Sequence, residues 1–142
     1  MTEIGLEFIP TPIENYTNDK SAMDAYIRFV DNKGGKHVIA IEMKYTDVLG
    51  VNEASRCEEQ KQMLVDTGLF SADFEKLLMG DKVKLTQIYR NLLLTERYRM
   101  VEGLKDSYSV VLSPKEHPST EEEIRSVTEF LKPEYAYKLS AV

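Results

Sequence analysis

The sequence predicts an α/β or α+β layer fold, because strand-like and helix-like segments follow one another along a chain of 142 residues. Three strand-like runs come first, helical segments dominate the middle, and one strand and one helix follow. The strands are expected at 4–9, 25–30, 38–45 and 107–112, and the helices at 52–66, 71–80, 81–102 and 119–131. The length suits a single domain over residues 1–142, and no low-complexity linker divides it.

The clearest local element is a β-hairpin made of residues 25–30 and 38–45. Both runs are rich in β-branched and aromatic residues, which favour strands. The connecting residues 31–36 include Gly34 and Gly35, and glycine supplies the positive φ that a tight turn needs. These features predict two neighbouring antiparallel strands.

Capping residues predict where the helices begin and end. Asn52 is expected to cap the first helix and Gly68 to end it, and Gly103 is expected to end the long helix. Ser119, with Glu122 three residues later, forms a capping box for the last helix.

The composition is that of an ordinary soluble protein, with 42% hydrophobic and 30% charged residues. No apolar run approaches the roughly 20 residues that a membrane span requires, and the N-terminus does not resemble a secretion signal. The single cysteine, Cys57, allows no internal disulfide and suits a reducing compartment, so a cytoplasmic location is expected.

The net charge of −6 argues against a protein that coats nucleic acid by charge alone. The charge is unevenly distributed, because residues 82–105 hold 6 Lys and Arg against 2 Asp and Glu. Two interpretations of this basic segment stay open. It contacts phosphates, or it pairs with acidic neighbours.

Glu42 and Lys44 lie two residues apart in the second strand of the hairpin, so their side chains point the same way. The opposite face of the strand is wholly apolar and consists of Ile39, Ile41, Met43 and Tyr45. If the turn centres between residues 33 and 35, paired positions sum to about 66–69, which places Asp24 opposite residues 42–45. Two carboxylates and one ammonium are therefore expected to converge at one end of the hairpin.

This grouping suits metal-dependent phosphodiester hydrolysis. The carboxylates of Asp24 and Glu42 provide the oxygen ligands that Mg²⁺ prefers, and Lys44 would orient a water and offset charge on the phosphate. The alternative is a solvated strand edge, because Glu-x-Lys is common by chance. The convergence with Asp24 and the apolar opposite face favour the catalytic interpretation.

Several stretches resemble the PD-(D/E)xK nuclease superfamily, and more closely a set of uncharacterised bacterial nuclease-like, restriction-endonuclease-like proteins. These stretches are Ser-Ala-Met-Asp-Ala-Tyr-Ile-Arg-Phe at 21–29, Ile-Ala-Ile-Glu-Met-Lys-Tyr-Thr at 39–46, the Gln-x-x-Arg-Asn-x-Leu-Leu helix within 85–94 and the strand end at 110–114. The resemblance covers most of residues 4–114.

The resemblance implies a restriction-endonuclease-like mixed central sheet with flanking helices and specific site residues. Asp24 and Glu42 would bind the metal together with the peptide carbonyl of Met43, Lys44 would be the catalytic lysine, and Gln87 would lie beside the active centre. The superfamily core opens with a helix that this sequence lacks before its first strand. The sheet face that this helix would cover is then bare, and three alternatives stay open: a truncated gene product, a degraded nuclease, or a homodimer or partner that covers the face.

The helix that carries Gln87 also carries polar residues with two possible roles. Leu85, Ile88, Tyr89 and Leu92 form an apolar stripe, and Gln87, Arg90, Asn91 and Tyr98 lie broadly opposite. Arg90 and Asn91 are candidate nucleic-acid contacts, with Arg90 facing phosphate. The alternative is a polar network that ties this helix to the sheet.

The sequence therefore predicts Mg²⁺-dependent hydrolysis of DNA phosphodiester bonds, with Mn²⁺ as a possible substitute. The alternative is a non-catalytic nuclease-like module for DNA binding or protein association. No zinc site is predicted, because His37 and His117 are far apart and lack neighbouring ligands. His37 is expected at the surface beside the turn.

Overall fold

A five-stranded mixed sheet in the order β1-β2-β3-β6-β7 forms the centre of the molecule. The structure is a computed structural model that describes residues 3–16, 22–44, 51–54, 62, 65–73, 83–114 and 118–142, without the side chains of residues 51–54, 83–87 and 118–119. The strands are β1 (Glu3–Phe8), β2 (Met23–Val30), β3 (Lys36–Met43), β6 (Asp106–Leu112) and β7 (Leu139–Ala141). The first three strands are antiparallel, and β6 and β7 continue the sheet in parallel.

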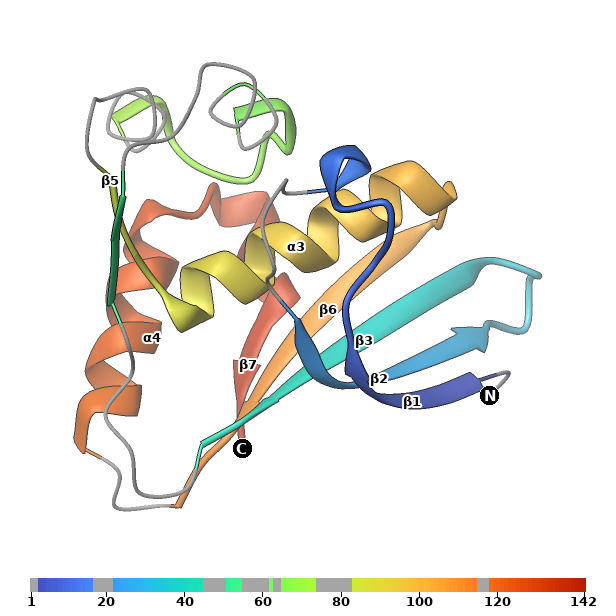
Figure 1. Ribbon diagram of the computed structural model, residues 1–142, viewed down its shortest axis with the longest axis horizontal. Helices are drawn as coiled ribbons and strands as arrows, with labels where there is room; N and C mark the ends of the chain where they lie inside the picture. Colours follow the sequence, from blue (N-terminus) through green and yellow to red (C-terminus); the bar gives the residue numbers. More distant parts are fainter. Residues whose placement is uncertain are drawn as a thin grey trace.

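The helix α3 (Gln87–Glu102) lies across one face of this sheet, and α4 (Pro118–Phe130) packs beside it (Figure 1). Two apolar clusters fill the space between α3 and its neighbours. One contains Tyr16, Met23, Tyr26, Val38, Ala40, Leu94, Tyr98 and Leu104. The other contains Leu69, Phe70, Ile88, Tyr89, Leu92, Leu93, Val111, Val127, Leu131 and Leu139.

The clusters contact α3 on more than one side. Of the apolar stripe predicted for this helix, Ile88, Tyr89 and Leu92 are buried, whereas Leu85 belongs to strand β5 (Val83–Thr86). Tyr98 was expected on the polar side, but it is also buried and accepts a hydrogen bond from Arg28 at 3.2 Å. The helix is thus a core element rather than an amphipathic surface helix.

The hairpin of β2 and β3 has a register at the lower end of the predicted range. Ala25 pairs with Ile41 and Val30 with Lys36, so paired positions sum to 66. The turn is closed by the Asp31 amide, which donates to the Gly35 carbonyl at 2.8 Å, and Gly34 has a φ of 83°. This register extends to Asp24 opposite Glu42.

The prediction that helices begin at Asn52 and at residue 81 is wrong. Residues Val51–Ala54 form strand β4, and Val83–Thr86 form strand β5, which pair as a separate antiparallel ribbon. Pairing between segments far apart in the chain overrides local helix preference here. Most of the remaining residues of the helices predicted at 52–66 and 71–80 lie outside the described residues.

His37 is buried, with 7% of its surface exposed, so its prediction as a surface residue is wrong. Its ring stacks on Phe29 at 4.8 Å between centroids, and its Nε2 lies 2.8 Å from Asp31 Oδ2. Asp31 also accepts the amides of Lys33 and Gly35, and these contacts together hold its carboxyl pKa well below the usual range. The carboxylate of Asp31 therefore organises the turn.

The C-terminal segment contributes elements that the sequence did not predict. A 3-10 helix, η2 (Pro133–Lys138), leads into β7, and its last residue, Lys138, is buried. The Lys138 ammonium lies 3.1 Å from Glu96 on α3 and 2.5 Å from Asp106 on β6. Arg99 adds a contact to Glu96 at 2.7 Å. This buried charge network joins three elements at the end of the sheet where β6 begins.

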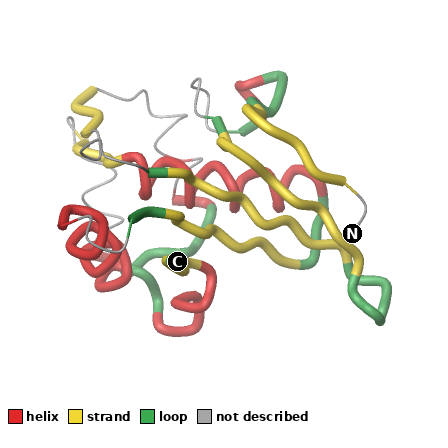
Figure 2. The backbone as a smooth tube through the Cα atoms, turned by 90° about the horizontal axis from the view of Figure 1, so that it is seen from below, coloured by secondary structure: helices red, strands yellow, loops and turns green. Residues whose placement is uncertain are grey.

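The face of the sheet opposite α3 lacks a described helix over its first three strands (Figure 2). Figure 2 views this face with α3 behind the strands, and no described helix lies in front of β1, β2 or β3. No described helix precedes β1 in the chain. Within the described residues, no helix is long and apolar enough to cross a membrane.

Candidate active site and metal centre

The start of β2 and the end of β3 bring Asp24, Glu42 and Lys44 to one region. The Met43 amide donates a hydrogen bond to Asp24 Oδ2 at 2.9 Å, which ties the acid on β2 to the end of β3. Glu42 and Lys44 alternate with Met43 and therefore point to the side of the sheet that α3 covers. The predicted convergence at this end of the hairpin is present in the structure.

Glu42 is a buried carboxylate, with only 6% of its surface exposed. Its Oε1 lies 3.0 Å from the Lys44 ammonium, and Lys44 is itself 5% exposed. Its Oε2 accepts a hydrogen bond from the side-chain amide of Asn91 on α3. Burial of a carboxylate is costly unless it is paired and hydrogen-bonded, and these two contacts meet that requirement.

Burial and the neighbouring acid raise the pKa of Glu42 to about 7. Desolvation is the largest cause, and the negative charge of Asp24 adds to it. The hydrogen bond and charge of Lys44 act in the opposite direction but do not cancel the rise. Two acids thus share a site with one lysine, and a further positive charge would stabilise both carboxylates.

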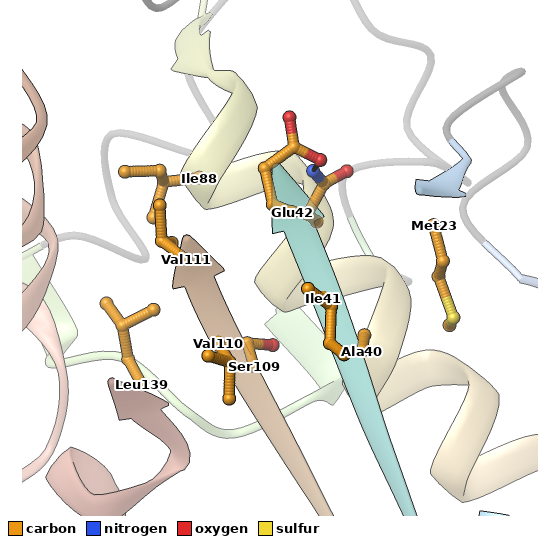
Figure 3. Close-up of a pocket in the computed structure, with 10 residues that line it drawn as sticks. Met23, Ala40, Ile41, Glu42, Ile88, Ser109, Val110, Val111 and Leu139 are labelled. Atoms are coloured by element: carbon orange, nitrogen blue, oxygen red, sulfur yellow. Dashed lines mark hydrogen bonds between the residues drawn. The ribbon is translucent and has the colours of Figure 1, made fainter. Parts of the chain in front are cut away.

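A small cavity lies below Glu42 between the sheet and α3. Figure 3 shows Glu42 at the end of β3, above a pocket whose walls also come from the rest of β3 and from β2, β6, β7 and α3. The space open to a water centre is about 10 Å³, which is near the lower limit for one water molecule. The hydroxyl of Ser109 also lines this cavity, and it has no hydrogen-bond partner among the described residues.

A comparison with protein-family models decides the assignment of the chain. The model of the PD-(D/E)XK nuclease superfamily matches residues 1–141. The chain belongs to the PD-(D/E)XK nuclease superfamily. The mixed five-stranded sheet with flanking helices agrees with the restriction-endonuclease-like α/β fold predicted for it. Searches of the curated proteins and of the solved structures found no match.

Membership in the PD-(D/E)XK superfamily makes nuclease chemistry the relevant class, and nucleases of this superfamily generally use divalent metal ions. The residues present fit such an ion. Asp24 and Glu42 offer carboxylate oxygens, and Met43, between Glu42 and Lys44 in the chain, offers its peptide carbonyl. Hard divalent cations prefer such oxygen ligands. In the described residues, no group of three or more His, Cys, Asp or Glu side chains could supply a complete ligand set.

The remaining predicted site residues lie on α3. Asn91, expected to contact nucleic acid, directs its amide to Glu42. Arg90 is half-buried, and its Nε makes no hydrogen bond within the described part of the chain. The backbone of Gln87 begins α3, but its side chain lies outside the described residues. Of these residues, Asn91 is the one whose contact with the site is described.

Much of the basic segment pairs with the protein itself. Arg97 donates to the main-chain carbonyls of Asn15 and Tyr16 at 2.9 and 3.0 Å. Arg99 pairs with Glu96, and Lys105 lies 3.3 Å from Asp31. Arg99 and Lys105 agree with the interpretation in which the segment pairs with acidic neighbours, whereas Arg97 binds main-chain carbonyls instead.

The contact of Asn91 with Glu42 could not be read from the sequence. The two residues are 49 positions apart, and only the packing of α3 on the sheet brings them together. The resemblance placed Asn91 on the helix that faces the site, which is the nearest signal that the sequence offers.

Proposed function

We propose that the chain is a Mg²⁺-dependent nuclease that hydrolyses phosphodiester bonds of DNA, with Asp24, Glu42 and Lys44 at its active site. One observation carries the proposal. A buried carboxylate with a raised pKa, Glu42, is held beside a second acid and a buried lysine at the end of two paired strands. Such combinations of burial and opposing charges are concentrated at functional sites.

The three residues have complementary roles in this proposal. Asp24 and Glu42, with the Met43 carbonyl, would hold the ion, and the hydrogen bond from Met43 to Asp24 fixes the first acid in place. Bound Mg²⁺ supplies polarisation of the phosphoryl oxygen and acidification of a water. The Lys44 ammonium orients the attacking water and offsets the charge that develops on phosphorus as the phosphorus–oxygen ester bond breaks.

A plasmid-nicking assay tests the proposal directly. The wild-type protein should convert supercoiled DNA to nicked or linear forms in Mg²⁺ or Mn²⁺ and be inactive in excess chelator. Asp24→Asn should abolish both the cleavage and the binding of Mn²⁺. Cleavage that survives in the Asp24→Asn variant would sink the assignment of this site.

A non-catalytic nuclease-like module for DNA binding or protein association is the second candidate. The contacts of Glu42 favour this candidate, because Lys44 and Asn91 already occupy its two carboxylate oxygens. Titration with Mn²⁺, monitored by calorimetry, separates the two functions. Binding that disappears in Glu42→Gln supports the enzyme, and DNA binding without any metal binding or cleavage supports the module.

Mg²⁺ is expected to raise the melting temperature of the protein more at about pH 8 than at about pH 6. The pKa of Glu42 is raised to about 7, so below that pH a proton competes with the metal for this carboxylate. Scanning fluorimetry with and without Mg²⁺ measures the effect. Equal shifts at both pH values would contradict the participation of Glu42.

In the absence of metal, the Glu42 carboxyl makes the folded protein less stable as the pH rises. Because the pKa rises from 4.5 in the reference state to about 7 in the fold, the folded state binds this proton more tightly. The resulting stabilisation is complete below pH 4.5 and is lost as the pH rises through about 7. Metal-free protein should therefore lose this contribution in the range where Mg²⁺ begins to stabilise the fold.

Replacement of Asn91 by alanine is expected to lower Mn²⁺ affinity by about 10- to 100-fold, since residues that orient metal ligands typically contribute this much. The amide of Asn91 holds Glu42 Oε2, and its loss leaves the carboxylate free to rotate away. Asn32→Ala, at an exposed turn position, is the matched control and should bind Mn²⁺ like the wild type. Equal affinity in both variants would show that Asn91 does not position Glu42.

A further inference from the structure

The sheet face opposite α3 carries continuous apolar rows across four strands. The register aligns Ile27 with Ile4 on one side and with Ile39 on the other, and Ile39 in turn with Tyr108. A second row runs from Leu6 through Ala25 and Ile41 to Val110. Residues paired in this way point to the same face of a sheet, so the eight side chains form one surface, here called the apolar sheet face.

This surface is open to solvent at its outer strand. On β1, Leu6 is 72% exposed and Ile4 is 58% exposed. None of the described helices lies over β1, β2 or β3 on this side (Figure 2). Apolar surface left in water costs about 25 cal/mol per Å², and soluble monomers rarely expose a contiguous patch of this kind.

The chemistry of the apolar sheet face selects against charged partners. Neither row contains a charged residue, although 30% of the chain is charged. Nucleic acid and an anionic membrane both bind through cations placed beneath their phosphates, and these two rows contain none. An uncharged face can meet an identical face without like-charge repulsion.

The aromatic residues beside these rows also argue against stacked bases. The ring of His37 stacks on Phe29 at 4.8 Å with an interplanar angle of 9°, and faces Tyr108 at 6.1 Å. The His37 ring therefore has an aromatic neighbour on each face, and Phe29 and Tyr108 each turn one face to it, which reduces the free ring surface that a base needs.

We propose that two copies of this chain associate symmetrically through the apolar sheet face. The face is four strands wide, and these strands are 6 to 8 residues long. With the usual spacing between strands and the usual rise per residue, the face measures roughly 19 Å by 20–26 Å. Because the side chains project from the sheet, the accessible area of the face is larger than this rectangle. It approaches the roughly 600 Å² that each partner buries in the smaller specific interfaces. Face-to-face packing of two sheets about 10 Å apart is a common arrangement, and a two-fold axis makes the same patch serve both copies.

Sedimentation equilibrium of the full chain over a range of concentrations tests this dimer. The wild type should be dimeric, and Leu6→Glu should shift the dissociation constant by at least about 100-fold, because it places two carboxylates in an apolar interface. Leu6 is largely exposed in one copy, so this change should leave the circular dichroism spectrum unchanged. Val101→Glu, at a 42% exposed position on α3, is the matched control and should remain dimeric.

Several outcomes would overturn the proposal. These are a wild type that is monomeric at every concentration, and a Leu6→Glu variant as dimeric as the wild type. A monomeric wild type could instead bind an oligonucleotide or an anionic vesicle. If Leu6→Glu abolishes that binding, the face belongs to that other occupant. Should Leu6→Glu fail to fold, Ile4→Glu repeats the test at the neighbouring exposed position. The measurement is independent of nuclease activity, so either proposal can fail alone.

Discussion

A Lys44→Met variant is expected to cleave DNA about 10²- to 10⁴-fold more slowly than the wild type while it retains Mn²⁺ binding. Lys44 is buried, and its ammonium lies 3.0 Å from Glu42 Oε1; in the proposed mechanism this ammonium would act on the water and the phosphate. Loss of one such proton-transfer or charge-stabilising group typically costs a factor in this range. The rate is measured under single-turnover conditions with saturating Mg²⁺, and Mn²⁺ affinity is measured separately by calorimetry.

The matched control for this variant lies on the same strand. Lys36 begins β3 at an exposed position, remote from the acids at its other end, so Lys36→Met should cleave at nearly the wild-type rate. Melting temperatures of both variants establish that the fold persists. If Lys44→Met and Lys36→Met cleave equally well, Lys44 has no catalytic role.

The second large effect is expected on stability, in the charge network around Lys138. Lys138→Met should lower the free energy of unfolding by about 3–5 kcal/mol, because it leaves the buried carboxylate of Glu96 without its closest buried cation. Lys138 and Glu96 are each 3% exposed, so water cannot replace the lost contact. Urea denaturation followed by circular dichroism measures the change.

Two further variants give this experiment its control. Lys132→Met, at a half-exposed position just before η2, should change stability by no more than about 0.5 kcal/mol. Glu96→Gln combined with Lys138→Met should recover part of the loss, because it removes a buried charge whose remaining cation is Arg99 alone. A Lys138→Met protein as stable as Lys132→Met would show that the network does not stabilise the fold.

The network and the proposed active site occupy opposite ends of the sheet. Asp106 begins β6 near Lys138, whereas Val111 near the end of β6 pairs with Glu42. Stability and catalysis are therefore expected to respond to different substitutions. Lys138→Met should reduce stability without changing Mn²⁺ affinity at temperatures where the protein is folded.

The sequence by itself determined the hairpin and the convergence of its acids. Alternation along β3 put Glu42 and Lys44 on one face, and the glycine turn limited the register closely enough to bring Asp24 opposite. These features are local, since strand geometry repeats every two residues and a short turn leaves few pairings. The resemblance to the nuclease superfamily rested on the same residues, and the family match over residues 1–141 confirmed it.

Tertiary structure alone decided the features that depend on distant pairs. Asn91 reaches Glu42 across 49 positions, and Lys138 reaches Glu96 across 42. Packing also buried His37, and it turned residues 52–54 and 83–86, expected in helices, into paired strands. A periodic pattern records which face of an element is apolar, but the partner that this face or a buried charge meets is fixed only when separate elements pack together.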